Sequence, residues 1–315
     1  MLLKILCLRH LDVSLMFCFI TVLGAFTVYD YDDPRVLPRH FTMFHLFEWK
    51  WDDIANECEE YLTKAGYGAV QVSPPTEHLI TEQVIDQRSD VSWNVRYQPT
   101  GYKLVSRSGN ESQFGQMVKR CNDVGVRIVV DIVLNHMVAA GQSSGQLGVK
   151  SSGGSYFNST PHFESFPGAN YTADHFNDFR CDDVIHQSDY GNNAERVRNC
   201  RLLKLVDLNQ GHSHVRKTVL GLMNRLIEIG VAGFRVDAAK HMWPADFGAI
   251  IEKLDPLNEK VFGTNKKPFI LHEVIDTGDG AIKVAEYLQI GRYTNFNFRI
   301  ALAEAVQNLN GKNYA

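Results

Sequence analysis

Four groups of polar side chains follow apolar runs that are typical of β-strands. They are Asp131 with Asn135 and His136, Arg235 with Asp237, Lys240 with His241, and His272 with Glu273. In a parallel α/β barrel the reacting groups collect at the C-terminal ends of the strands. Two carboxylates at neighbouring strand ends, as Asp237 and Glu273 would be, are what hydrolysis of a glycosidic bond requires. One attacks the anomeric carbon, and the other gives a proton to the leaving oxygen and later activates water.

The neighbours of the two carboxylates predict different ionisation states for them. Arg235 lies two residues before Asp237 and therefore on the same strand face, where a cation favours the ionised carboxylate that a nucleophile needs. Glu273 follows the apolar run 269–271, and partial desolvation there would raise its pKa toward that of a useful acid. Each carboxylate could instead cap a helix or form a structural ion pair, and the Asn-His pair after the earlier strand could be a loop turn.

Strand-like runs alternate with helical patterns along most of the chain. Strands are expected near residues 41, 68, 127, 233, 269 and 293 (the last over 293–298), and helices over 51–65, 111–124, 213–229, 245–254, 281–288 and 300–309. Repeated strand–helix units predict an α/β fold with a parallel sheet covered by helices, of the (β/α)8 barrel type. The interval 137–207 is rich in Gly, Ser, Asn and Asp and has no helical period, so we expect an inserted, irregular β-rich subdomain there, after the third strand.

Residues 1–25 are predicted to be a secretory signal peptide. Lys4 and Arg9 precede an apolar run, and Gly24 and Ala25 are the small residues expected near a cleavage site. The alternative is a membrane anchor, but the uncharged stretch 13–29 is shorter than the ~20 apolar residues that a spanning helix usually needs. We therefore expect a secreted, extracellular protein with no membrane association after the signal is removed.

Composition and cysteine content narrow the class of protein further. The 315 residues are 44% hydrophobic with a net charge of -4, which fits a globular protein and disfavours a nucleic-acid binder, because such a binder needs a basic excess. Four cysteines remain outside the signal, namely Cys58, Cys121, Cys181 and Cys200. An even number fits an oxidising compartment, and the residues alone leave all three pairings open.

Several segments together resemble the α-amylase family of glycoside hydrolases. Three of its four hallmark segments are matched by Asp131-Ile-Val-Leu-Asn-His136, Gly233-Phe-Arg-Val-Asp-Ala-Ala-Lys-His241 and His272-Glu-Val-Ile-Asp276. The chloride-dependent animal type is indicated by His45-Leu-Phe-Glu-Trp-Lys-Trp51, Gln71-Val-Ser-Pro-Pro75, Arg96-Tyr-Gln-Pro99 and Lys240-His-Met-Trp-Pro244. The resemblance covers residues 41 to about 312 in the family's order.

The resemblance implies retaining endo-hydrolysis of α-1,4-glucosidic bonds in starch and glycogen by a secreted, monomeric enzyme. It implies Asp237 as nucleophile, Glu273 as general acid/base and Arg235 as a chloride ligand. The implied Ca²⁺ ligands are Asn135, Arg198 through its main-chain oxygen, Asp207, and the main-chain carbonyl of His241. The residues implied to line the sugar subsites are Trp93, Tyr97, Gln98, His136, Lys240 and His241.

The same resemblance pairs Cys58 with Cys121 and Cys181 with Cys200, and it divides the chain into parts. Residues 26–136 and 208–315 would form the catalytic barrel, and 137–207 the calcium-binding insertion. The family's fourth hallmark segment, with its third catalytic carboxylate, would follow residue 315, so we expect a barrel truncated after about six strands and a chain without measurable turnover when expressed alone. The alternatives are a short inactive product that at most binds glucan and a maltase-type α-glucosidase; the runs at 45–51 and 240–244 argue against the latter.

Overall fold

Six parallel strands form the central sheet of the protein. The computed structural model describes residues 31–81 and 92–307. The sheet order follows the chain order: β1 (Thr42–Leu46), β2 (Tyr67–Val72), β4 (Arg127–Val133), β10 (Gly233–Asp237), β11 (Phe269–His272) and β12 (Arg292–Tyr293). Every neighbouring pair is parallel. Sequential parallel order is the winding of a (β/α)8 barrel, so the predicted fold class and all six strand positions are confirmed, with six of the eight barrel strands among the described residues.

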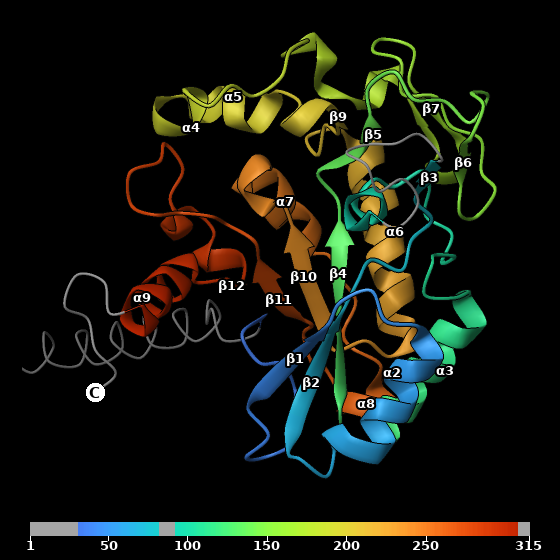
Figure 1. Ribbon diagram of the computed structural model, residues 1–315, viewed down its shortest axis with the longest axis vertical. Helices are drawn as coiled ribbons and strands as arrows, with labels where there is room; N and C mark the ends of the chain where they lie inside the picture. Colours follow the sequence, from blue (N-terminus) through green and yellow to red (C-terminus); the bar gives the residue numbers. More distant parts are fainter. Residues whose placement is uncertain (1–30, 82–91, 308–315) are drawn as a thin grey trace, which may run out of the picture.

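The inner strands β2, β4, β10 and β11 are largely buried because their sequences are mostly apolar, whereas the edge strands β1 and β12 are largely exposed. In β4 every residue from Ile128 to Val133 is buried, and Asp131 is the one charged side chain among them. Helices cover the outer face of the sheet (Figure 1). They are α2 (Trp51–Glu57) with its π-helical continuation η3 (Cys58–Leu62), α3 (Glu111–Asp123), α6 (Ser213–Ile229), α7 (Pro244–Ile251) and α8 (Glu259–Phe262). A further helix, α9 (Phe296–Val306), follows the last strand. Parallel strands covered in this way carry no polar alternation, which is why the sequence shows none.

Local sequence signals set the ends of two of these helices. Asn110 and Gln113 form a capping box at the start of α3, each side chain bonding the other's backbone N–H. Gly230 ends α6 with a φ of 113°, a left-handed conformation that favours glycine. The predicted ranges 111–124 and 213–229 are therefore met to within one residue.

The segment between β4 and β10 forms small antiparallel pairs and short helices, and it lies beyond the C-terminal ends of β4 and β10 (Figure 1). The pairs within the segment are β5 (His136–Ala139) with β9 (Leu205–Asp207) and β7 (Ser165–Phe166) with β8 (Tyr171–Thr172). Its strand β6 (Val149–Ser151) pairs with β3 (Leu79–Thr81), which lies between β2 and β4 in the chain. The helices are α4 (Asp189–Asn192) and α5 (Ala194–Asn199). Buried aromatic side chains such as Phe157, Phe166 and Phe176 fill its interior.

Short 3-10 turns connect the larger elements. They are η4 (Trp93–Tyr97), η5 (Pro167–Ala169), η6 (Ala173–His175), η7 (Asn177–Phe179), η8 (Leu202–Lys204), η9 (Ala239–His241), η10 (Val284–Glu286) and η11 (Leu288–Ile290). The helix expected over 281–288 is wrong, because η10 and η11 occupy that region. The strand expected over 293–298 is limited to Arg292–Tyr293, since the Asn295 side chain caps the backbone N–H of Phe298 and α9 starts at Phe296.

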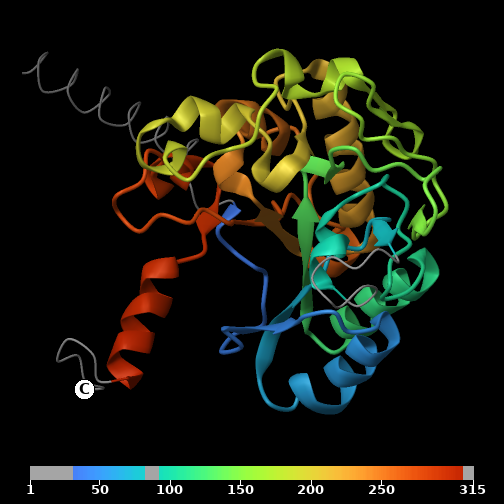
Figure 2. The ribbon, with the colours of Figure 1, turned by 45° about the horizontal axis from the view of Figure 1, so that its top comes forward.

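The structure contains both disulfides that the family resemblance implies. Cys58 is bonded to Cys121, joining η3 to α3, and Cys181 to Cys200, closing the chain around α4 and α5. The predicted signal peptide, 1–25, lies outside the described residues. Within 31–81 and 92–307 no helix has the length and apolarity needed to cross a membrane. Helix α9 buries none of its side chains and stands away from the sheet (Figure 2).

Candidate active site

Arg235 lies at the centre of the site, with three carboxylates around its guanidinium. Its Nη1 is 2.6 Å from Asp131 Oδ1 and 2.8 Å from Asp237 Oδ1, and its Nη2 is 2.5 Å from Glu273 Oε1. Strand register explains the first contact, because Arg235 in β10 pairs with Asp131 in β4. Glu273 directly follows β11, the other neighbour of β10. The parallel sheet thus brings both predicted catalytic carboxylates to one point.

The ionisation of this network differs from the simple prediction that Arg235 keeps Asp237 charged. Burial raises the pKa of Asp237 well above its usual value, and the nearby Asp131 and Glu273 add to the rise, while Arg235 opposes it. Burial likewise raises the pKa of Asp131, again against Arg235. The single positive charge of Arg235 cannot neutralise three carboxylates, so the site without substrate favours a proton on one of them. The effect of Arg235 has the predicted sign, but the prediction left out burial and the two other carboxylates.

Glu273 and Asp237 differ in their access to the cleft. The Glu273 side chain is 23% exposed and that of Asp237 12%. The Glu273 Oε2 accepts a 2.9 Å hydrogen bond from the backbone N–H of Ala238, which has a φ of 50°. A 3.0 Å bond from the Glu273 N–H to the Val236 carbonyl ties the two strand ends together. The more exposed carboxylate is therefore held firmly in place, as an acid that must reach a leaving group should be.

All six residues predicted to contact sugar line a single cleft of about 1430 Å³, together with Arg235, Asp237 and Glu273. Tyr97 donates a 2.7 Å hydrogen bond to Asp131 Oδ2, and the His136 Nε2 lies 2.9 Å from the Tyr97 carbonyl. The Lys240 Nζ donates to the Ile275 carbonyl at 2.7 Å. Trp93 is 57% exposed and its ring lies 6.2 Å from that of Phe47, which also lines the cleft. An exposed aromatic ring in a cleft offers a stacking surface for a sugar face.

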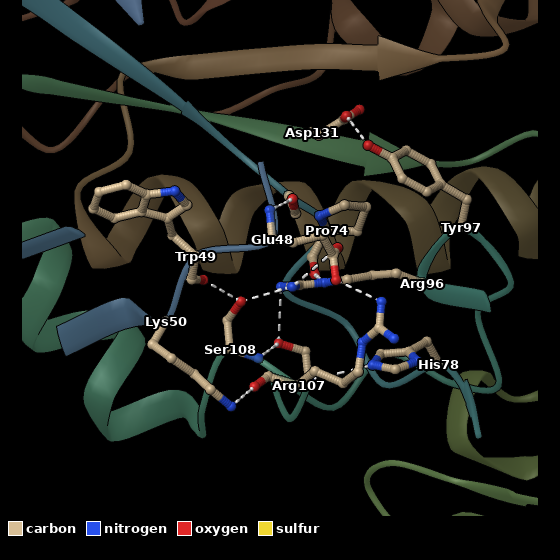
Figure 3. A network of polar contacts seen from close by, with 12 residues as sticks. Glu48, Trp49, Lys50, Pro74, His78, Arg96, Tyr97, Arg107, Ser108 and Asp131 are labelled. Carbon is tan, nitrogen blue, oxygen red and sulfur yellow. Dashed lines mark hydrogen bonds and ion pairs between the residues drawn. The ribbon is translucent and has the colours of Figure 1, made fainter. Parts of the chain in front are cut away.

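A buried polar network holds the turn that carries Trp93 and Tyr97, and the sequence argument did not anticipate it (Figure 3). Arg96 is fully buried; its Nε donates to the Pro74 carbonyl at 3.0 Å and its Nη1 to Ser108 Oγ at 2.6 Å. Its guanidinium also stacks over Trp51 at 5.3 Å.

Asp131 is a second residue without a predicted role. It was noted at its strand end, but its contacts with Arg235 and Tyr97 depend on sheet register.

The predicted Ca²⁺ ligands fall into two pairs, and each pair is brought together by a contact with the backbone. Asn135 and Asp207 meet where β5 begins and β9 ends: the Leu208 N–H donates to the Asn135 carbonyl at 2.9 Å. The His241 Nδ1 lies 2.9 Å from the Val197 carbonyl, next to Arg198. The Arg198 guanidinium forms an ion pair with Glu286, with 2.8 Å between Nη2 and Oε2. Only the main-chain oxygen of Arg198 therefore fits the role of a Ca²⁺ ligand.

The donor chemistry of this set fits a hard cation. Asn135 is fully buried and its Oδ1 has no hydrogen-bond partner. Asp207 is buried as well, and burial raises its pKa well above its usual value, although Asn177 donates to its Oδ2 at 2.7 Å. An orphaned amide oxygen beside a buried carboxylate is an oxygen-rich environment of the kind that Ca²⁺ takes. A cation would satisfy both groups.

A parallel barrel-type sheet with two carboxylates at adjoining strand ends defines a class of glycoside hydrolases. Residues 52–312 match the family model described as "Alpha amylase, catalytic domain". The chain therefore belongs to the α-amylase family. It is 49% identical over 280 residues to rat pancreatic α-amylase, covering 89% of this chain and 53% of that protein, and 44% identical over 304 residues to Pecten maximus α-amylase, covering 95% and 56%.

A solved α-amylase structure has the same fold as this chain. The crystal structure of α-amylase I from Eisenia fetida matches with a TM-score of 0.81 at 40% identity, covering 90% of this chain and 54% of that one. A variant of that enzyme has been solved in complex with maltohexaose. The chain spans about half the length of the curated relatives it matches.

Proposed function

We propose that the cleft hydrolyses α-1,4-glucosidic bonds within starch and glycogen chains, with retention of the anomeric configuration. The observation that supports this most directly is the convergence of Asp237 and Glu273 on Arg235 at adjoining strand ends. Asp237 is the nucleophile, and Glu273 is the general acid/base that first protonates the leaving oxygen and then activates water. The animal α-amylases among the relatives support the substrate class.

Asp131 and Arg235 set the charge state in which these steps occur. Asp237 must be ionised to attack, whereas Glu273 must carry a proton to donate it. A proton on Glu273 removes one of the two negative charges that raise the pKa of Asp237, so the proton on one carboxyl favours ionisation of the other. Arg235 then faces fewer anions and stabilises the remaining ones.

Chloride fits Arg235 as a proposed ligand. A guanidinium has five N–H donors, and the three carboxylate contacts of Arg235 leave N–H groups for an anion. A bound anion would add negative charge beside the two catalytic carboxyl groups.

Products distinguish this function from the alternatives. We expect the site to release a range of short oligosaccharides from amylose and little glucose from maltose. Activity is measured on the 315-residue chain and on the same chain fused to the remaining portion of an animal relative, called here the extended protein. Glucose as the first product from maltose would indicate a maltase-type α-glucosidase, and glucan binding without cleavage by either form would indicate a binding module.

We infer a bound Ca²⁺ at Asn135, Asp207 and the main-chain oxygens of Arg198 and His241, where it would join the 137–207 subdomain to the barrel formed by 26–136 and 208–315. The β5–β9 pair supports this, since it closes the insertion at residues next to these ligands. The two disulfides support the proposal that the protein is secreted. We also propose that the enzyme acts as a monomer.

Chelation with EDTA is expected to lower the thermal midpoint of the chain. Saturation at 100 to 1,000 times Kd contributes about 2.7 to 4.1 kcal/mol, equivalent to roughly 5–15 °C for a domain of this size. The midpoint is followed by calorimetry, and adding Ca²⁺ alone should restore it. Asp207→Asn should abolish the response to Ca²⁺. An unchanged midpoint after chelation of the wild-type chain would show that the calcium assignment is wrong.

A further inference from the structure

A second polar cluster lies in the inserted segment beside the Cys181–Cys200 disulfide, and none of its members belongs to the cleft or the proposed calcium set. His162, Asp178 and Asp182 place one ligand atom each within 4.8 Å of one another. The His162 Nε2 is 2.8 Å from Asp182 Oδ2, and the His162 backbone N–H donates to Asp178 Oδ2 at 3.1 Å. These three residues are called the His162 cluster below.

Glu164 adds a buried carboxylate to the His162 cluster. Glu164 is 3% exposed, and neither of its carboxylate oxygens has a hydrogen-bond partner. It lies against the carboxyl group of Asp178. A buried carboxylate without a partner is costly, so this arrangement requires a compensating positive charge.

Arg201 supplies only part of that charge. Its Nη2 is 2.8 Å from Asp178 Oδ1 and 2.5 Å from Asp182 Oδ1, so its ion pairs go to these two carboxylates. Three carboxylates against one guanidinium leave two negative charges when His162 is neutral. A divalent cation would bring the group to neutrality. The alternative is two protons, one on His162 and one on Glu164.

The chain holds the members of the cluster in place before any ligand arrives. Asp182 follows Cys181 and Arg201 follows Cys200, so the disulfide fixes these two residues beside each other. The Arg201 backbone N–H donates to the Asp183 carbonyl at 2.9 Å, and the Ile185 N–H donates to the Arg201 carbonyl at 3.0 Å. A preorganised set of ligands lowers the entropy cost of binding an ion.

We propose that His162, Asp178 and Asp182, with the buried Glu164 behind them, form a binding site for a divalent transition-metal ion, with Zn²⁺ as the probe. The imidazole distinguishes this site from the all-oxygen calcium set, because imidazole with carboxylates suits zinc and its neighbours, whereas Ca²⁺ takes oxygen ligands. The ion supplies the positive charge that Glu164 lacks.

Isothermal titration of the full chain with ZnCl₂, in the presence of saturating Ca²⁺, tests the site. One Zn²⁺ per chain should bind. His162→Ala is expected to weaken binding by about 10- to 100-fold. His186→Ala is the matched control: His186 is also exposed and pairs with an aspartate, with its Nε2 3.1 Å from Asp183 Oδ2, but it lies outside the cluster. It should leave Zn²⁺ binding unchanged.

Glu164→Gln provides a second variant that keeps the shape of the buried side chain. It should weaken Zn²⁺ binding and raise the thermal midpoint of the zinc-free chain, since a neutral amide is cheaper to bury than an unpaired carboxylate. The proposal is overturned if the wild-type chain binds no Zn²⁺, or if His162→Ala binds it as tightly as the wild type. It is equally overturned if binding is lost in His212→Ala but kept in His162→Ala, because the ion would then sit at the neighbouring rings of His175, His212 and His214.

Discussion

Asp237→Asn in the extended protein is expected to lower kcat for amylose hydrolysis by on the order of 10⁴-fold or more while the fold is retained. Asn has nearly the shape of Asp but cannot attack the anomeric carbon as an anion. Its amide also carries no negative charge, so the variant relieves the crowding of carboxylates around Arg235. Its thermal midpoint should therefore equal or exceed that of the wild type. Reducing-sugar release and calorimetry measure the two quantities.

Asp123→Asn is the control for this substitution. Asp123 is an exposed carboxylate at the end of α3, where it pairs with Lys119 far from the cleft. Its loss should leave kcat within about twofold of the wild-type value, because an exposed ion pair contributes at most about 1 kcal/mol. Turnover by Asp237→Asn close to that of this control would exclude Asp237 as the nucleophile.

Arg235→Leu is expected to lower the free energy of unfolding by about 3–5 kcal/mol at neutral pH, because it leaves buried carboxylates without their cation. The loss should depend on pH in a defined direction. Without Arg235 the pKa values of Asp131 and Asp237, already raised by burial, rise further. Carboxyl groups with raised folded-state pKa values favour the folded state least when ionised, so stability should fall as pH rises above about 4 and recover on acidification.

Arg235→Lys separates charge from shape in the same experiment. Lysine keeps the positive charge but cannot make the forked contacts of the guanidinium, so its loss of stability should be smaller and its pH dependence weaker. Denaturant unfolding at several pH values gives the comparison. Equal stability of Arg235→Leu and the wild type at neutral pH would contradict the network described above.

Most of the barrel could be predicted from the sequence because parallel strands buried on both faces are apolar runs, and their spacing matches the helices between them. The C-terminal elements could not. Residues 293–298 are rich in aromatic side chains and read as a strand, but the Asn295 side chain caps a helix there. In the region read as the helix 281–288, the Asp276 carboxylate accepts the N–H groups of Gly278 and Val284 and stabilises a loop before the short 3-10 turns.

Site residues that directly follow an apolar run could be predicted from the sequence. Contacts that depend on how the strands pair could not. Asp237 and Glu273 follow apolar runs and carry chemistry that the family resemblance makes specific. The contact between Asp131 and Arg235 depends on the pairing of β4 with β10, which only the folded sheet defines. Because of that contact, Asp131 shares the guanidinium of Arg235 with Asp237 and Glu273. Burial, with Asp131 and Glu273, raises the pKa of Asp237, and none of these effects can be predicted from the residues next to Asp237 in the sequence.

The most direct test of the nucleophile assignment is to trap the covalent intermediate. The extended protein is incubated with an activated fluoro-maltoside that forms a glycosyl–enzyme ester but is slow to hydrolyse, then digested and analysed by tandem mass spectrometry. The account predicts a single sugar ester on the Asp237 carboxylate, and no ester in the Asp237→Asn variant. An ester on Glu273 or Asp131 in the wild-type protein would contradict it.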